Sequence, residues 1–100
     1  MEVIINKKES KTIVKLNGRV DTSNVEQFQH DIDPLMHGDN PDIVLDCSEL
    51  TYTSSQGLRM FLMLQKSVIA RNGKMVMTNM TPQVKEVFDI TGFSNIITIL

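Results

Sequence analysis

The chain has 100 residues, of which 41% are hydrophobic and 22% are charged, and its formal net charge is −2. This composition predicts one globular domain spanning residues 1–100, and it excludes a disordered chain or a second domain of ordinary size. The ten basic residues are scattered along the chain, so no basic patch favours nucleic acid binding. No apolar segment resembles a signal peptide or a membrane span, and we expect a cytoplasmic protein with no membrane partner.

Two runs of β-branched residues predict a hairpin at the start of the chain. Residues 3–5 and 12–16 are strand-like, and the charged residues 7–11 form the loop between them. The Asn17-Gly18 pair marks a turn or a bulge, and Val20 resumes extended structure.

The first helix is predicted from apolar residues at helical spacing. N-cap candidates at residues 21–24 precede this pattern, which contains Val25, Phe28, Ile32, Leu35 and Met36. Pro34 lies inside the pattern and predicts a kink or a restart, because proline lacks a backbone donor. A loop at residues 37–41 ends the helix.

Strands and helices alternate through the rest of the chain. Residues 42–46 form an apolar strand typical of burial on both faces, and residues 47–53 are predicted as a connecting loop. A long helix follows at about residues 56–71, then a strand at residues 74–78. Thr81-Pro82 starts another helix that stops near Gly92, and residues 96–100 form a last strand. This order predicts an α/β fold: a mixed β-sheet with an N-terminal hairpin, then βαβ units, with the helices packed mainly on one face.

The start of the long helix carries the strongest functional signal. In open α/β sheets, ligands and partners meet the protein at the carboxyl ends of strands, and a helix N-terminus stabilises a phosphate there. A Ser hydroxyl in the Ser54-Ser55 pair is therefore both a helix-cap candidate and a phosphorylation candidate. Gly57, in the first turn, costs about 1 kcal/mol relative to Ala, which indicates a close approach by backbone or by a partner.

The sequence offers few residues suited to catalysis or to metal binding. Ser55 and Gly57 match the second half of a G-x-S-x-G nucleophile elbow, but Thr53 replaces the first Gly and both His residues precede the Ser. We therefore expect a protein that is not an enzyme. One Cys, Cys47, and two His residues cannot assemble the usual zinc site, so we expect neither a metal nor a cofactor.

Two motifs resemble those of a known family. Residues 46–59, D-C-S-E-L-T-Y-T-S-S-Q-G-L-R, are similar to the signature of STAS domains, specifically of stand-alone anti-sigma factor antagonists. In that family an apolar strand leads into D-x-S-x-(apolar)-x-(aromatic), and then D-S-S-G-L or S-S-A-G-L-R opens a helix. Residues 18–24, G-R-V-D-T-S-N, are similar to the family's second motif. The resemblance covers nearly the whole chain and agrees with the predicted order of elements.

The resemblance implies a binding switch. In the family, the unphosphorylated domain binds an anti-sigma factor that is a Ser/Thr protein kinase, and this binding frees a sigma factor. The kinase phosphorylates the Ser two positions before the Gly-Leu pair, which is Ser55 here, and a PP2C-type phosphatase reverses the step. No direct contact with nucleic acid is implied.

The chain departs from the family pattern at two positions. Ser54 stands where many members have Asp, which makes Ser54 an alternative phosphoacceptor, and Gln56 replaces a Ser or Ala. Asp21 either adds like charge beside the phosphate or caps the first helix. The predicted partner-binding residues are Asp21, Thr22, Ser54, Ser55, Gln56, Gly57, Arg59, Met60 and Met63.

Two of these predictions have stated alternatives. Met60 and Met63 lie off the apolar stripe of their helix, and they either join the binding surface or fill the edge of the core. Many family members continue into a final helix beyond the last strand, whereas this sequence ends at Leu100; we expect an apolar patch for a partner or a weak homodimer. The alternative function is a constitutive STAS subunit of a transporter or sensory complex, without a phosphoswitch.

Overall fold

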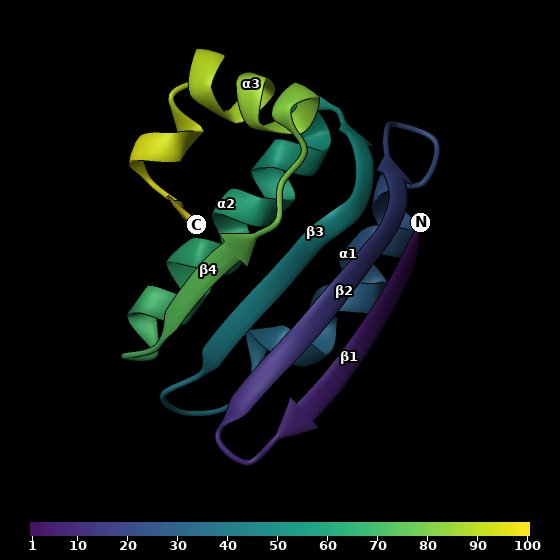
Figure 1. The fold of residues 1–100 in the computed structure, drawn as a ribbon. Helices are drawn as coiled ribbons and strands as arrows, with labels where there is room; N and C mark the ends of the chain where they lie inside the picture. Colours follow the sequence, from purple (N-terminus) through teal and green to yellow (C-terminus); the bar gives the residue numbers. More distant parts are fainter.

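The computed structural model describes residues 1–100 and contains one five-stranded sheet in the order β1-β2-β3-β4-β5 (Figure 1). The strands are β1 (Glu2–Lys8), β2 (Lys11–Val20), β3 (Asp42–Thr53), β4 (Lys74–Thr78) and β5 (Thr98–Ile99). β1 is antiparallel to β2, and the other neighbours pair in parallel. The predicted hairpin followed by βαβ units is therefore confirmed.

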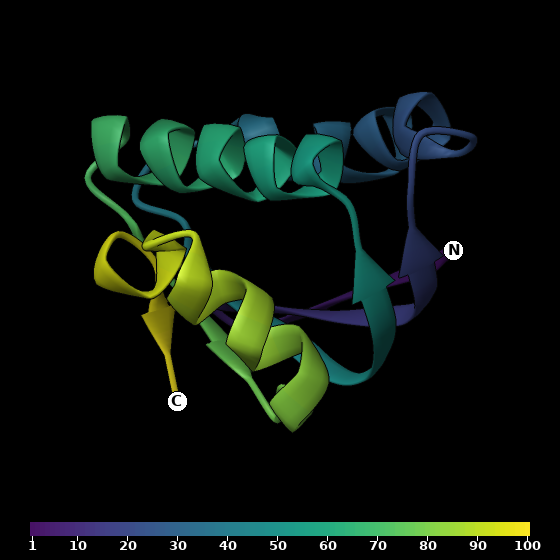
Figure 2. The same cartoon turned by 90° about the horizontal axis from the view of Figure 1, so that it is seen from above.

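Three helices cover the sheet. They are α1 (Val25–Ile32), α2 (Ser55–Ala70) and α3 (Pro82–Ile90), and short 3-10 turns follow α1 and α3 at Asp33–Met36 and Phe93–Asn95. α1 and α2 run along one face of the sheet, while α3 lies across the carboxyl ends of β3 and β4 (Figures 1 and 2). The 3-10 turn that contains Pro34 confirms the predicted restart. No helix has the length and apolar character needed to cross a membrane.

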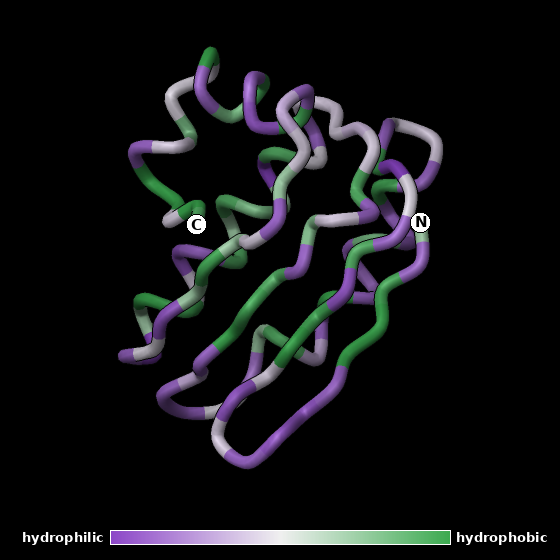
Figure 3. The backbone as a smooth tube through the Cα atoms, in the orientation of Figure 1, coloured by the Kyte–Doolittle hydropathy of each residue, from purple (hydrophilic) through white to green (hydrophobic).

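The core joins the three helices to the central strands. The Phe61 ring of α2 contacts Phe28 of α1 and Phe88 of α3, with ring centroids 5.4 and 5.9 Å apart. Such aromatic pairs contribute about 0.5–1.5 kcal/mol beyond the area they bury. Hydrophobic segments occupy the middle of β1, β2 and β3, whereas the turn between β1 and β2 is hydrophilic (Figure 3). The buried core therefore fixes the position of α2 on the sheet.

β3 is longer than predicted. Residues 47–53, predicted as a loop, continue the strand and pair with the end of β2. The register shifts on either side of Asn17-Gly18, where Gly18 has φ +117°, which confirms the predicted bulge. Buried residues in this part of β3 are consequently three positions apart, at Cys47, Leu50 and Thr53. The usual alternation of a strand is absent, which explains why the sequence suggested a loop.

Two further boundaries differ from the prediction. The hairpin loop shrinks from residues 7–11 to the two residues between β1 and β2. β5 has two residues instead of five, because the N–H groups of Ile96 and Ile97 both donate to the Phe93 carbonyl and so extend the preceding turn instead of the strand.

Candidate functional site

The two sequence motifs meet where β2 and β3 end. Val20 and Thr53 are register partners, and the backbone N–H of Ser54 donates to the Val20 carbonyl at 2.9 Å. The turn after β2, which carries Asp21, therefore lies beside the start of α2. The structure thus brings Asp21 and the Ser54-Ser55 pair together where β2 and β3 end, and these strand ends lie at the top in Figure 1.

The two adjacent serines have different roles in the helix start. Ser54 is the N-cap, with φ −86° and ψ 172°, and its Oγ accepts a hydrogen bond from the Gly57 N–H at 3.2 Å. A Ser in this role contributes about 1 kcal/mol relative to Ala. Ser55 is the first residue of α2; its side chain is exposed and makes no hydrogen bond in the structure. The free hydroxyl of the pair is therefore the one on Ser55.

Gly57 lets the first turn of α2 lie directly on the strand ends. A Cβ atom at this position would be 2.4 Å from Thr53 Oγ1 and 2.6 Å from Val20 Cγ1. Both distances are far below van der Waals contact, and both neighbours are buried, β-branched side chains. The close approach indicated by the sequence is thus made by the protein's own side chains, and Gly57 is itself buried beneath the site.

Asp21 is held within its own turn. Its Oδ2 accepts from Arg19 Nε at 3.0 Å, and its Oδ1 accepts from the Ser23 N–H at 2.9 Å and from the Ser23 hydroxyl. Hydrogen bonds from the Ser23 side chain and backbone, followed by Arg19, lower the pKa of the Asp21 carboxyl. The carboxylate therefore stays charged at neutral pH.

The turn after β2 also orders the entrance to α1. The Asp21 N–H donates to Asn24 Oδ1 at 2.8 Å, and Asn24 Nδ2 donates to the Arg19 carbonyl at 2.8 Å. The Arg19 guanidinium lies over the Tyr52 ring of β3, 4.9 Å from its centroid. Asp21 does not cap α1 as one alternative expected: the N-cap is Asn24, which makes no side-chain cap hydrogen bond, and the Asp21 carboxylate bonds Ser23 and Arg19 in the preceding turn instead. Thr22 is exposed in the same turn.

The outer face of α2 presents mainly polar side chains. Gln56 and Arg59 are exposed, and Arg59 makes no hydrogen bond or ion pair. Met60 is half-buried and packs against the core, whereas Met63 is 45% exposed. The alternative that these methionines fill the edge of the core therefore describes Met60, and Met63 is the more exposed of the two.

Cys47 and His37, considered from the sequence as possible metal ligands, do not form a reactive or metal-binding site. Burial, followed by the nearby charge of Asp46, raises the pKa of the Cys47 thiol to about 12, so this thiol stays protonated at neutral pH. His37 Nε2 lies 3.4 Å from Asp33 Oδ2 at the surface. The structure contains no group of three or more His, Cys, Asp or Glu side chains that could hold a metal ion.

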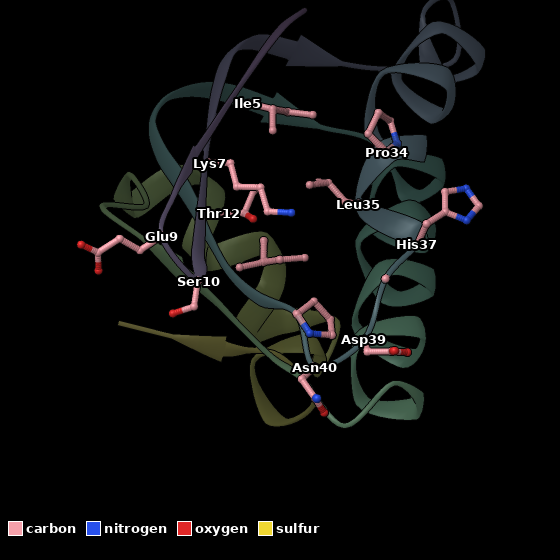
Figure 4. A pocket seen from close by; sticks show the side chains of 13 residues that line it. Ile5, Lys7, Glu9, Ser10, Thr12, Pro34, Leu35, His37, Asp39 and Asn40 are labelled. Atoms are coloured by element: carbon pink, nitrogen blue, oxygen red, sulfur yellow. The ribbon is translucent and has the colours of Figure 1, made fainter.

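A cleft of about 650 Å³ at the other end of the strands was not anticipated from the sequence. It lies between the β1–β2 hairpin and the loop of residues 37–41. Lys7 extends into it, while His37 and Asp39 point away (Figure 4). Its lining comes from segments distant in sequence, which only the fold brings together. Ser55 does not line this cleft.

Several apolar side chains near the end of the chain are exposed. Ile90 is 77% exposed, Ile96 is 50% exposed and Leu100 is 75% exposed. The expected use of such residues by a partner or by a second copy stays a prediction.

Comparison with known proteins yields one family and several similar folds. The family model described as STAS domain matches residues 2–100. BtrV of Bordetella bronchiseptica, named as an anti-sigma factor antagonist, is 33% identical over 96 residues, which cover 96% of this chain and 83% of BtrV. A solved structure described as an anti-sigma factor antagonist from Thermotoga maritima has a TM-score of 0.86 at 20% identity, covering 97% of this chain and 84% of that one.

The structure is also similar to two forms of SpoIIAA, an anti-sigma factor antagonist. The unphosphorylated form has a TM-score of 0.79 at 21% identity, covering 99% of this chain and 88% of SpoIIAA. The phosphorylated form, from Bacillus, has a TM-score of 0.73 at 20% identity, covering 99% and 91%. These likenesses concern the fold.

Proposed function

The chain belongs to the STAS domain family, and from this premise we propose that it is a cytoplasmic anti-sigma factor antagonist controlled by phosphorylation of Ser55. The unphosphorylated chain binds an anti-sigma factor that is a Ser/Thr protein kinase, and this binding frees a sigma factor. The similarity to BtrV, which extends over 96% of the chain, supports the role of antagonist.

The observation that carries the proposal is that the hydroxyl of Ser55 is free, whereas the hydroxyl of the adjacent Ser54 is already hydrogen-bonded as the helix cap. A kinase needs a hydroxyl that can enter its active site, and Ser55 is exposed, with no hydrogen bond to give up. Ser54 is half-buried, and its Oγ caps α2 through Gly57. Transfer of a phosphoryl group to Ser54 would remove that cap. Ser55 is therefore the better acceptor of the two.

The phosphoryl group changes the site through charge and bulk. The γ-phosphoryl group of ATP is transferred to Ser55 Oγ, the hydroxyl proton is lost, and ADP leaves. The product carries about −1.5 to −2 charges at the first residue of α2. The first turn of α2 contains no acidic residue, so the partial positive charge of the helix start can accommodate the phosphate. The helix need not unfold when it is modified.

A partner that fits the unmodified hydroxyl then meets repulsion. The charged Asp21 carboxylate lies on the neighbouring strand end and adds negative charge to the same edge. The partner-binding surface that we propose contains the exposed residues Thr22, Gln56, Arg59 and Met63 around Ser55. A PP2C-type phosphatase restores the binding form by hydrolysing the phosphoserine.

The proposal is tested by phosphate mapping and by binding. The wild-type chain, Ser55→Ala and Ser54→Ala are incubated with ATP and with the anti-sigma factor kinases of the same genome, and phosphopeptides are identified by mass spectrometry. We expect phosphate on Ser55 in the wild type and in Ser54→Ala, and none in Ser55→Ala. Phosphate on neither serine, or on Ser54 alone, would contradict the proposal.

The binding arm uses isothermal calorimetry with the same kinase in the absence of ATP. Ser55→Ala should retain binding, and Ser55→Asp should weaken it, because Asp places a charge where the partner meets a neutral hydroxyl. Equal affinity of the two variants would favour a constitutive STAS subunit without a switch.

A further inference from the structure

We propose that Arg59 binds the phosphoryl group on Ser55 and so acts as a positioning residue of the switch. The inference rests on the proposed phosphorylation of Ser55 and adds the residue that receives the new charge. In the modified protein, Arg59 turns toward the phosphate and is removed from the surface offered to the partner.

Ser55 and Arg59 are spaced so that they share one face of α2. Ser55 and Arg59 are four positions apart in one continuous helix, and both are exposed. Residues at this spacing lie on the same face one turn apart, with Cβ atoms about 5–6 Å from each other. Long side chains in helices lean toward the N-terminus, so we expect the Arg59 side chain to reach back toward the turn that begins at Ser55.

Arg59 differs from the other two arginines in that its side chain has no hydrogen-bond or ion-pair partner. Arg19 forms an ion pair with Asp21 at 3.0 Å. Arg71 donates to the backbone carbonyls of Leu35 and Gly38, at 2.7 and 3.2 Å, and also to Ser67. Arg59 makes no ion pair or hydrogen bond. It can therefore turn to a new anion without breaking an existing contact.

An arginine and a phosphoserine are also chemically matched. A planar guanidinium can donate two parallel hydrogen bonds to phosphate oxygens, which a point charge cannot do. A neighbouring cation favours the dianionic form of phosphoserine over the monoanionic form, so Arg59 should lower the second pKa of the group from its usual value of about 6. Ser54 lies outside the helix, five positions before Arg59, and does not share this alignment.

The test measures that second pKa without any kinase. Phosphoserine is installed at position 55 during translation, and its 31P chemical shift is followed against pH in the otherwise wild-type chain, in Arg59→Gln and in Lys66→Gln. Lys66→Gln is the matched control, because it removes one positive charge from an exposed site of α2 about 16 Å from Ser55, beyond the screening length of about 8 Å.

We expect Arg59→Gln to raise the second pKa by about 0.2–0.4 and Lys66→Gln to change it by less than about 0.1. Arg59→Lys should keep part of the lowering, since it retains the charge and loses the planar fork. In a second arm, phosphoserine at position 54 should respond much less to Arg59→Gln. Equal values for Arg59→Gln and Lys66→Gln, or an equal response at both serines, would overturn the inference.

The outcome is separable from that of the proposed function. The phosphoserine is introduced without an enzyme, so a kinase that fails to modify Ser55 would contradict the proposed function and leave the 31P result standing. Conversely, a second pKa insensitive to Arg59 would overturn only the role of Arg59. Backbone amide spectra of each variant check that the fold is retained, as expected for exposed residues whose side chains make no hydrogen bond or ion pair.

Discussion

The two ends of the sheet are held in opposite ways. At the carboxyl ends of β2 and β3, the backbone is fixed by close packing of Gly57 against buried neighbours, while the side chains of Ser55 and Arg59 are free. At the other end, a cleft separates the β1–β2 hairpin from the loop of residues 37–41, and the side chain of Arg71 fastens that loop to α2. A fixed backbone with free side chains suits a site that is modified without refolding.

The end of the sheet at the β1–β2 hairpin also carries like charges that destabilise it. Lys8 and Lys11 are direct register partners across β1 and β2, and like charges in that position are destabilising. Lys7 extends into the cleft instead of packing (Figure 4). We therefore expect the stability of the hairpin end to depend on a few hydrogen bonds, such as those of Arg71, and the stability of the Ser55 end to depend on the close packing around Gly57.

The largest effect is expected from Arg71→Ala at the cleft. The substitution removes the bonds to the Leu35 and Gly38 carbonyls and those to Ser67, and we expect a loss of about 2 kcal/mol in the free energy of unfolding. Urea denaturation measures the loss. Arg59→Ala is the matched control, because it removes the same side chain from a site without contacts and should cost less than about 0.5 kcal/mol. Equal losses in the two variants would show that the loop is held by something other than Arg71.

Gly57→Ala tests the opposite end. The added Cβ overlaps Thr53 and Val20, which costs about 1–3 kcal/mol, and the better helix propensity of Ala returns about 1 kcal/mol. We expect a net loss of about 1 kcal/mol, together with amide chemical shift changes at Ser54 and Ser55. Gln56→Ala, at the adjacent exposed position, should leave stability within about 0.5 kcal/mol. If Gly57→Ala is as stable as Gln56→Ala, then Val20 and Thr53 can shift to accept the added Cβ at little cost. The backbone at the Ser55 end would then not be fixed by packing, and the two ends of the sheet would not differ in this way.

Local signals were sufficient to predict most of the fold. Thr81 and Pro82 begin α3 as expected, with Thr81 Oγ1 accepting from the Val84 N–H, and Pro34 restarts its helix. Each of these features depends on the chemistry of one or two residues. The second half of β3 could not be recognised, since its burial follows a register set by the bulge at Gly18 in another strand. A long-range pairing leaves no periodicity in the segment itself.

The site was predictable as a location and less so in its detail. Helix-start chemistry and the two motifs indicated that residues near Ser55 and Asp21 would matter, and β2 and β3 bring them together. Which serine caps the helix depends on whether α2 begins at residue 55 or at residue 56. The ends of helices are the features that a sequence predicts least accurately. No sequence pattern predicted the cleft near Lys7, because the residues that line it come from segments that share no motif.

The smallest expected effect is a pH dependence that distinguishes the two ends through Asp21 and Asp39. Hydrogen bonds from Ser23, followed by Arg19, lower the pKa of Asp21 in the folded chain below 3.8, so its contribution to stability is present above that pH and is lost as the pH falls through the folded value. Asp21→Asn removes this titration. The variant should therefore lose less stability than the wild type between pH 7 and pH about 3, measured by urea denaturation.

Asp39→Asn is the matched control, because it makes the same change in charge in the loop at the cleft, where the carboxylate accepts no hydrogen bond. If Asp21→Asn and Asp39→Asn have the same profile, the turn after β2 is not held by the Asp21 carboxylate. Shape alone would then keep Asp21 beside the start of α2, and the charge of Asp21 would be available to repel the phosphate on Ser55.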